Sequence, residues 1–277
     1  MQKIDVSIVI VSFNTKDLLR ACLAAAAAGE IIVVDNSSAD GSVEMVKKEF
    51  PGVTLIANSQ NRGFAAANNM GLKCARGRYM LLVNSDTQVP PGAIEEVTRF
   101  MDEHLDIGVV GVKLMLPNGK MDPACHRGFP TPWAALTYFL GLEKIHSRVF
   151  AQYHQLYKNL NEPHEIDSPS GAFYFLRREV YESVGGLDED YFMYGEDLDW
   201  SYRIKQKGWK IYFYPRVTIL HHKKQSGRAS GDPILRKKTQ QYFYETMKLF
   251  YNKHYSHRYS PLVTALIQLG IKFRSML

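Results

Sequence analysis

Four clusters of polar side chains each follow a short apolar run, the pattern of ligand-binding loops at strand ends. They are Ser12-Phe13-Asn14, Asp35 to Ser42, Asn61-Arg62-Gly63-Phe64 and Asn84-Ser85-Asp86. In an open parallel sheet, ligands bind beyond the carboxyl ends of the strands. Any one cluster could equally be ordinary turn chemistry, because Asp, Asn, Ser and Gly dominate loops. Four on one edge predict a single binding site.

The elements that must position these clusters alternate between strand and helix. Strands are expected at Val6–Val11, Ile31–Val34, Val53–Ile56 and Tyr79–Val83, and helices at Thr15–Ala28, Gly41–Phe50, Phe64–Ala75 and Pro91–His104. Pro91 is expected in the first turn of its helix, where proline is well tolerated. Short apolar strands alternating with helices predict an α/β fold with a mainly parallel sheet covered on both faces.

The second half of the chain is less regular. From about Pro123 to Glu165 it is rich in aromatic residues with weak periodicity, and these could line a pocket or form core. Beyond this segment we expect strands at Ala172–Leu176 and Trp209–Tyr214, and helices at Asp197–Lys207 and Gln240–His254.

Composition and missing motifs exclude several classes of protein. Ser12-Phe13-Asn14-Thr15 has no glycine, so the dinucleotide-binding GxGxxG loop is absent, and there is no Walker loop. A nucleotide would therefore be held by side chains and a metal. The net charge of +6 suits an anionic small molecule, a membrane face or nucleic acid equally well. Three dispersed cysteines, no secretory signal and no run long enough to span a bilayer predict a cytoplasmic location.

The clusters, read in order, resemble the family-2-type glycosyltransferases of GT-A fold, and specifically their rhamnosyltransferase-like branch. The matching pieces are Val9 to Asn14, Val33 to Ser42, Asn61 to Asn68, Leu81 to Asp86, Ser170-Gly171-Ala172-Phe173, Arg177-Arg178, Gly185 to Glu189 and Tyr191 to Trp200. The resemblance covers roughly Val6 to Ser226. It implies a Rossmann-like, mixed but mostly parallel sheet flanked by helices, with a C-terminal helical appendage. It also implies inverting transfer of a sugar from a nucleotide diphosphate.

The resemblance assigns roles to the strand-end clusters. Asp35 should read the nucleobase, and the rest of the nucleotide-sugar pocket should comprise Ser12, Asn14, Arg62, Gly63, Phe64, Asn68, Asn84 and Ser85. Asp86 should hold the metal as the last carboxylate of a DXD-like motif. The sequence departs from that motif at Asn84, where the family has Asp. One carboxylate with neutral neighbours fits Mg²⁺, which takes its other oxygens from water and substrate phosphates.

Glu196 and Asp197 match the family's ED motif. An acceptor hydroxyl must lose its proton as it attacks, and a carboxylate within hydrogen-bond reach is a sufficient base. By the resemblance, Asp197 is the base and Glu196 orients or supports it. The alternative is a helix N-terminus enriched in acids, which is common.

His221 fits the spacing of a family histidine near the metal or diphosphate better than His222 does. An imidazole ligand would favour Mn²⁺ over Mg²⁺, whereas a surface histidine in a basic loop is the alternative. The basic residues around it could contact diphosphate or an anionic lipid, or could simply be solvated: Lys223, Lys224, Arg228, Arg236, Lys237 and Lys238.

The sequence therefore predicts a glycosyltransferase with dTDP-L-rhamnose as first-choice donor, a UDP-sugar as second, and a cell-surface or lipid-linked glycan as acceptor. Residues 1–115 should bind the donor, 116–226 the acceptor, and 227–277 should form the appendage. A catalytically silent nucleotide-sugar-binding protein is the alternative that Asn84 keeps open. A nucleic-acid-binding module is disfavoured, because the basic residues lie beside the presumed site.

The last segment, Pro261 to Leu277, has an amphipathic pattern. Leu262, Leu266, Leu269 and Phe273 share one helical face, and Thr264, Gln268 and Lys272 form a polar stripe. With Lys253, Arg258 and Arg274 nearby, this predicts an interfacial helix on the cytoplasmic face of the inner membrane. A helix docked on the protein itself, or an oligomer contact, fits the same pattern.

Overall fold

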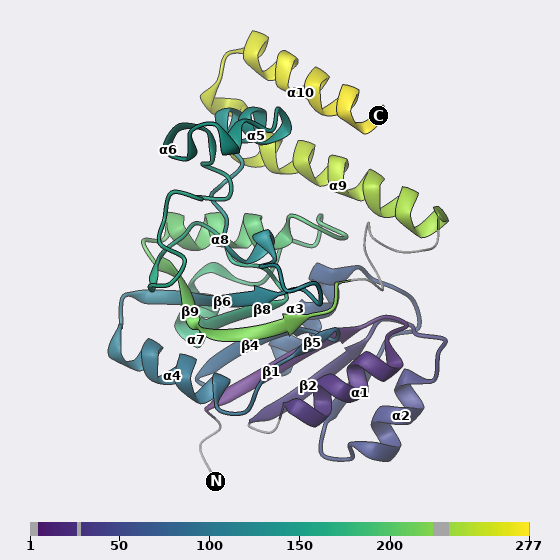
Figure 1. The fold of residues 1–277 in the computed structure, drawn as a ribbon. Helices are drawn as coiled ribbons and strands as arrows, with labels where there is room; N and C mark the ends of the chain where they lie inside the picture. The colour runs from purple at the N-terminus through teal and green to yellow at the C-terminus, as the bar shows by residue number, and fades with distance from the viewer. Residues whose placement is uncertain (1–4, 27–28, 224–232, 277) are drawn as a thin grey trace.

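The computed structural model describes residues 5–26, 29–223 and 233–276. Within them, nine strands form one sheet, in the order β3-β2-β1-β4-β8-β6-β9-β5 with β7 also paired to β9 (Figure 1). The strands are β1 (Val6–Ser12), β2 (Glu30–Asp35), β3 (Thr54–Ala57), β4 (Tyr79–Asn84), β5 (Thr87–Gln88), β6 (Ile107–Met115), β7 (His164–Glu165), β8 (Phe173–Arg177) and β9 (Lys210–His221).

The sheet is mixed but mostly parallel, as expected. β1, β2, β3 and β4 pair in parallel, β8 runs antiparallel to both β4 and β6, and β9 is parallel to β6. Ser12 pairs with Asp35, and Val11 with Asn84. These pairings bring the carboxyl ends of three strands, with their polar clusters, to one edge of the sheet.

Helices flank the sheet and extend beyond it. They are α1 (Lys16–Ala25), α2 (Ser42–Glu49), α3 (Phe64–Cys74), α4 (Ala93–Glu103), α5 (Pro132–Phe139), α6 (Ser147–Phe150), α7 (Arg178–Val184), α8 (Glu196–Gln206), α9 (Pro233–His254) and α10 (Pro261–Met276), with short 3₁₀ turns η1 (Pro123–Cys125), η2 (Leu142–Lys144) and η3 (Ser256–Arg258). In Figure 1, α8 lies above β6 and β9 and α4 below them, and both helices contact β9.

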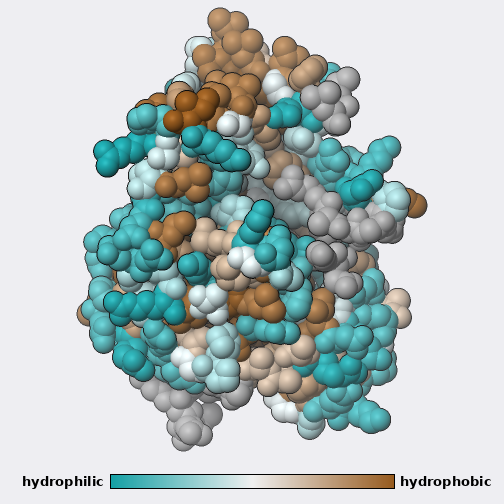
Figure 2. Space-filling view, viewed as in Figure 1, coloured by the Kyte–Doolittle hydropathy of each residue, from teal (hydrophilic) through white to brown (hydrophobic). Residues whose placement is uncertain are grey.

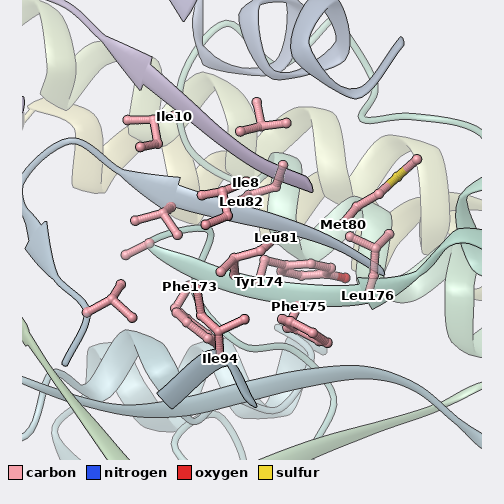
Figure 3. Close-up of a cluster of buried hydrophobic side chains, with 14 of the residues drawn as sticks. Ile8, Ile10, Met80, Leu81, Leu82, Ile94, Phe173, Tyr174, Phe175 and Leu176 are labelled. Atoms are coloured by element: carbon pink, nitrogen blue, oxygen red, sulfur yellow. The ribbon is translucent and has the colours of Figure 1, made fainter. Parts of the chain in front are cut away.

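The core lies where β1, β4 and β8 meet (Figure 3). Ile8, Leu81 and Phe175 are almost completely buried there. Strands apolar on both faces are what a sheet covered on both sides requires. Burial of this kind contributes about 25 cal/mol per Å² of apolar surface removed from water.

The appendage consists of α9 and α10, and α5 and α6 lie beside it, at the end of the molecule away from the N-terminus (Figure 1). It is helical, as expected. No helix in the described part of the chain combines the length and apolarity needed to cross a membrane.

Two local expectations differ from the structure. α4 begins at Ala93, because Gly92 adopts a left-handed conformation (φ +81°) and turns the chain into the helix, so Pro91 precedes the first turn. β9 is longer than expected: it continues beyond Tyr214 through a register shift relative to β6 and ends at His221.

Candidate functional site

Buried hydroxyl groups join the ends of β1 and β4. Ser12 Oγ lies 3.1 Å from Thr15 Oγ1, which lies 2.8 Å from Ser85 Oγ. Both predicted residues, Ser12 and Ser85, are thus in one hydrogen-bonded chain that fixes the loop after β1 against the loop after β4.

Asp35, the last residue of β2, has one oxygen available for a ligand. Its Oδ1 accepts a hydrogen bond from the Ser38 amide at 2.9 Å, whereas Oδ2 is buried and has no partner among the described residues. A buried carboxylate oxygen without a partner is costly, so its presence points to a donor supplied by a bound molecule.

Asn14 connects the same two loops. It adopts a left-handed conformation (φ +54°), which Asn tolerates better than most residues. Its backbone N–H donates to Ser38 Oγ at 2.9 Å, and its side-chain Oδ1 accepts from the Ala39 backbone N–H at 2.8 Å. Asn14 thereby shapes the loop that carries Asp35.

The segment from Arg62 to Phe64 is held from two sides. Asn36 accepts from the Arg62 amide at 3.0 Å and donates to the Gly63 carbonyl at 3.1 Å. The Phe64 amide donates to the Phe192 carbonyl at 2.7 Å. Gly63 has φ +85°, and a Cβ there would lie 2.6 Å from that carbonyl, so only glycine fits.

The side chains of this segment differ in exposure. Arg62 is exposed, whereas Asn68 is buried and donates from Nδ2 to the Phe64 carbonyl at 2.9 Å, inside the first turn of α3. Asn36 belongs to a matching motif, but no role was predicted for it. Its position directly after Asp35 at a strand end was the available signal.

Asp86, in the turn after β4, lies beside His221, the last residue of β9. His221 Nε2 lies 3.3 Å from Asp86 Oδ1, and Nδ1 lies 3.0 Å from Oδ2 of the fully buried Asp122. Lys223 Nζ reaches Asp122 Oδ1 at 2.7 Å. Asp122 therefore orients the imidazole so that Nε2 faces Asp86, the arrangement by which outer-shell carboxylates orient histidine ligands.

The electrostatics of this group follow from the same contacts. Burial opposes the charged form of His221, but the hydrogen bonds that its ring donates to Asp122 and Asp86 outweigh burial and raise its pKa to about 9. Burial likewise acts to raise the pKa of Asp122, yet His221 and Lys223 hold it well below its usual range. Without a cation, the imidazolium of His221 thus lies between the carboxylates of Asp86 and Asp122, and its Nε2 would release a proton on binding a metal.

Residues at this point fit a divalent cation. Asn84 Oδ1 is buried without a partner among the described residues. It is therefore a further candidate oxygen ligand for a cation, in addition to Asp86 and His221. No group of three or more His, Cys, Asp or Glu side chains is placed to hold a metal within the described ranges. A cation here would complete its coordination with diphosphate oxygens and water, as Mg²⁺ commonly does.

The acidic pair lies at the start of α8. Gly195, with φ +80°, turns the chain so that α8 begins at Glu196. Asp197 Oδ2 accepts from Arg127 Nη2 at 2.6 Å and from the Gly171 amide at 3.1 Å, and Oδ1 accepts from the Leu198 amide at 2.8 Å. These donors fix the orientation of the carboxylate while leaving Oδ1 further capacity to accept a proton.

Glu196 is in a different environment. Its Oε2 is buried and has no partner among the described residues. Burial, together with the neighbouring Asp197 charge, raises the pKa of Glu196 to about 8. At neutral pH Glu196 is therefore largely protonated.

A cavity of about 700 Å³ is lined both by Asp86 with His221 and by Glu196 with Asp197. Six predicted residues line it: Phe64, Asn84, Asp86, Glu196, Asp197 and His221. The remaining predicted residues lie outside the lining that the structure describes: Ser12, Asn14, Asp35, Arg62, Gly63, Asn68 and Ser85. Aromatic side chains of the middle segment and α9 form another part of the wall, including Tyr138, Phe139, Tyr153, Tyr244 and Phe250.

Two residues of the site were missed by the sequence analysis. Arg127 and Asp122 both lie in the irregular segment after β6, where no periodic pattern marks them. Of the basic residues singled out, Lys223 lines the cavity, and Arg236, Lys237 and Lys238 are exposed on α9. Lys224, Ser226 and Arg228 lie outside the described residues.

Comparison with known proteins adds a family match. The model described as "Glycosyl transferase family 2" matches residues 7–185. The N-acetylglucosaminyl-diphospho-decaprenol L-rhamnosyltransferase of Mycobacterium tuberculosis is 27% identical over 209 residues, which cover 71% of this chain and 67% of that protein.

Solved structures show the same fold. GalNAc-T7, in complex with UDP, GalNAc and Mn²⁺, aligns with a TM-score of 0.59 and 16% identity, covering 90% of this chain and 50% of that one. The mannosyltransferase PcManGT from Pyrobaculum calidifontis, in complex with GDP-Man and Mn²⁺, aligns with a TM-score of 0.57 and 15% identity, covering 99% and 81%. The chain thus spans only half the length of GalNAc-T7.

Proposed function

The chain belongs to glycosyl transferase family 2, and from that premise we propose that it is an inverting, metal-dependent glycosyltransferase. It would move a sugar from a nucleotide diphosphate to a hydroxyl group of a glycan. The observation that carries this proposal is one cavity lined at once by Asp86 with His221 and by Glu196 with Asp197. Displacement of a diphosphate by a hydroxyl needs both groups: one for the leaving anion and one for the proton.

Donor binding is assigned to the strand ends of residues 1–115. Asp35 Oδ2, buried without a described partner, would accept a hydrogen bond from the N–H of a pyrimidine base. Asn14 and Asn36 shape the two loops on either side of it. Asp86, His221 and the amide oxygen of Asn84 would hold a Mg²⁺ or Mn²⁺ ion. When bound, that ion would offset charge on the leaving diphosphate, worth several kcal/mol.

Acceptor activation is assigned to Asp197, within residues 116–226. Its carboxylate takes the proton of the acceptor hydroxyl as the hydroxyl oxygen bonds to the anomeric carbon from the face opposite the nucleotide. The bond from that carbon to the diphosphate oxygen breaks, and its electron pair leaves with the diphosphate. Arg127 keeps the carboxylate oriented throughout. Glu196, protonated near neutral pH, adds no second negative charge to the base.

The sugar and the acceptor are proposed by class. The mycobacterial relative is a rhamnosyltransferase, which makes dTDP-L-rhamnose the first-choice donor and a UDP-sugar the second. The aromatic wall of the cavity, including Tyr138 and Tyr153, suits a glycan acceptor, because sugar rings stack on aromatic faces. A cell-surface or lipid-linked glycan made in the cytoplasm is the proposed acceptor.

A panel of nucleotide diphosphates and their sugars, with and without Mg²⁺ or Mn²⁺, tests the proposal by thermal shift. A ligand at a hundred times its dissociation constant should add about 2.7 kcal/mol to the free energy of unfolding. We expect this with dTDP or dTDP-rhamnose, and only with metal. No shift with any pyrimidine nucleotide would exclude the proposal.

The second candidate is a nucleotide-sugar-binding protein without turnover. Asn84 favours it, because this residue stands where the family motif has an acid. Release of free nucleotide diphosphate from a bound donor distinguishes the two: an active transferase releases it in the presence of acceptor, and a silent binder does not.

A further inference from the structure

The last helix, α10, turns a mixed face toward the protein, on which Ile267 packs against a buried aromatic cluster and polar side chains contact α9. Thr264 Oγ1 lies 2.9 Å from the hydroxyl of Tyr251 on α9. Gln268 Nε2 donates to Asn252 Oδ1, also on α9, at 3.2 Å. A helix on the surface of a water-surrounded protein usually buries its whole apolar stripe, whereas α10 buries little of it beyond Ile267.

The apolar side of α10 consequently faces outward. Leu262, Leu266, Leu269 and Phe273 are 71%, 61%, 63% and 63% exposed. Four large apolar side chains on one helical face form a contiguous patch, and such patches mark interaction sites.

A second element continues the patch. The segment from α5 through η2 to α6 exposes five more large apolar side chains: Trp133, Leu136, Leu140, Ile145 and Val149. Arg274 joins the two elements, because its Nη2 donates to the Phe139 carbonyl at 2.5 Å and its guanidinium lies 5.1 Å from the centre of that ring. We call these nine apolar side chains the distal surface; hydrophobic residues gather at this end of the molecule in Figure 2.

Charge around the distal surface selects the partner. Residues 132–150 and 261–276 contain a single acid, Glu143, which is largely buried and paired with His154 at 3.0 Å. Lys144, Arg148 and Lys272 are exposed among the apolar side chains. A second copy of the chain would bring like charges together, whereas an anionic lipid surface satisfies both the apolar and the basic side chains.

We propose that the distal surface docks the protein on an anionic bilayer through two elements, α10 and the α5–α6 segment, with their apolar side chains inserted among the lipids. The sequence predicted membrane contact for α10 alone. The proposal adds the α5–α6 segment, which also forms part of the cavity wall. The inner side of α5 lines the cavity through Ala135 and Tyr138, so docking sets the cavity beside the membrane.

Flotation with vesicles tests the proposal without requiring activity. The full chain should float with phosphatidylcholine vesicles that contain phosphatidylglycerol, and much less with phosphatidylcholine alone. The double variants L266E/L269E on α10 and L140E/I145E on the α5–α6 segment should each weaken partitioning roughly tenfold or more. Leu105→Glu is the matched control, because Leu105 is 74% exposed but lies between α4 and β6.

Far-ultraviolet circular dichroism and the nucleotide thermal shift check that each variant folds. Wild-type flotation lost in both double variants, with the control unchanged, supports the two-element surface. Equal flotation of wild type and L140E/I145E overturns the role of the α5–α6 segment. Absence of flotation, together with a dimer in sedimentation that L266E/L269E dissociates, overturns membrane docking in favour of a second copy. Loss of nucleotide binding alone bears on the proposed function and leaves this inference untouched.

Discussion

Arg127 Nη2 lies 2.6 Å from Asp197 Oδ2 in an ion pair whose two side chains are only about a tenth exposed. The same nitrogen donates to the Pro169 carbonyl, so the guanidinium is anchored to the backbone as well as to the acid. A base that must meet a hydroxyl at one angle benefits from such an anchor, because transfer depends steeply on geometry.

Asp197→Asn tests the base directly. The change keeps size and removes basicity, so transfer should fall by roughly 10²–10⁴-fold, the usual worth of a positioned base. Nucleotide binding should survive, because Asp35 and Asp86 are unchanged. Donor affinity and transfer rate are measured for each protein.

Asp190→Asn is a suitable control for Asp197→Asn, because the Asp190 side chain is 69% exposed. Asp199 is a poor control: it is buried and bonded to both Arg203 and His254, so its loss would destabilise the fold. Near-normal transfer by Asp197→Asn would move the base elsewhere, with Glu196 next in line.

Glu196→Gln should change how stability depends on pH. The pKa of Glu196 is raised from an ordinary 4.5 to about 8, so between these values the folded protein holds a proton that the unfolded chain releases. The contribution of protonated Glu196 to the free energy of unfolding is therefore fully present below about pH 4.5. It is lost as pH rises to about 8, at up to about 1.4 kcal/mol per pH unit. Urea unfolding from pH 5 to 8 should show a shallower decline in the Gln variant.

The same variant separates the two carboxyl groups kinetically. With Asp197 as base, Glu196→Gln retains most transfer activity at neutral pH, since glutamine resembles the protonated acid. If instead the wild-type rate climbed toward pH 8 and the variant were inactive, Glu196 would be the base.

Asp86→Asn should weaken metal-dependent nucleotide binding as well as turnover, which distinguishes it from Asp197→Asn. Asp122→Asn removes the partner that orients His221, and loss of an outer-shell group typically costs about 10- to 100-fold in metal affinity. Titration of Mn²⁺ in the presence of dTDP measures the metal affinity of both variants. His257→Asn, at an exposed histidine, is the control. Equal Mn²⁺ affinity in all variants would show that the metal does not bind at Asp86 and His221.

Asp35→Ala should reduce affinity for pyrimidine nucleotides by roughly 10- to 100-fold, because a hydrogen bond to a charged group contributes about 1.5–3 kcal/mol. The stability of the ligand-free variant should change little, because the lost hydrogen bond from the Ser38 amide to Oδ1 is offset by removal of the buried, unpartnered Oδ2. Isothermal titration with dTDP and thermal melts of the free protein provide the two readings. A variant that binds dTDP normally would show that the base is read elsewhere.

Much of the fold was predictable because apolar runs mark buried strands. β1, β2 and β4 lie within a residue or two of their predicted bounds. β6 was missed because Gly108, Gly111 and Lys113 interrupt its apolar run. The antiparallel insertion of β8 was also unpredictable, because strand direction within a sheet is set by tertiary connections rather than by local sequence.

The candidate site was predictable only where a motif marks it. Asp86 and Asp197 follow patterned elements, and the structure places both on one cavity. Arg127 and Asp122 follow no pattern, because their roles come from three-dimensional contacts made by irregular backbone. The raised pKa of Glu196 is equally invisible in sequence, since it depends on burial.

The position of β8 has a consequence for how the protein can be made. β8 is the strand that joins β4 to β6, yet it is synthesised some sixty residues after β6 begins (Phe173 against Ile107). A nascent chain that has emerged only as far as Met115 therefore presents β4 with one hydrogen-bonding edge open, and open edges recruit other strands. Fragments that stop before β8 should aggregate, because residues 1–115 can complete their part of the sheet only after β8 has been synthesised.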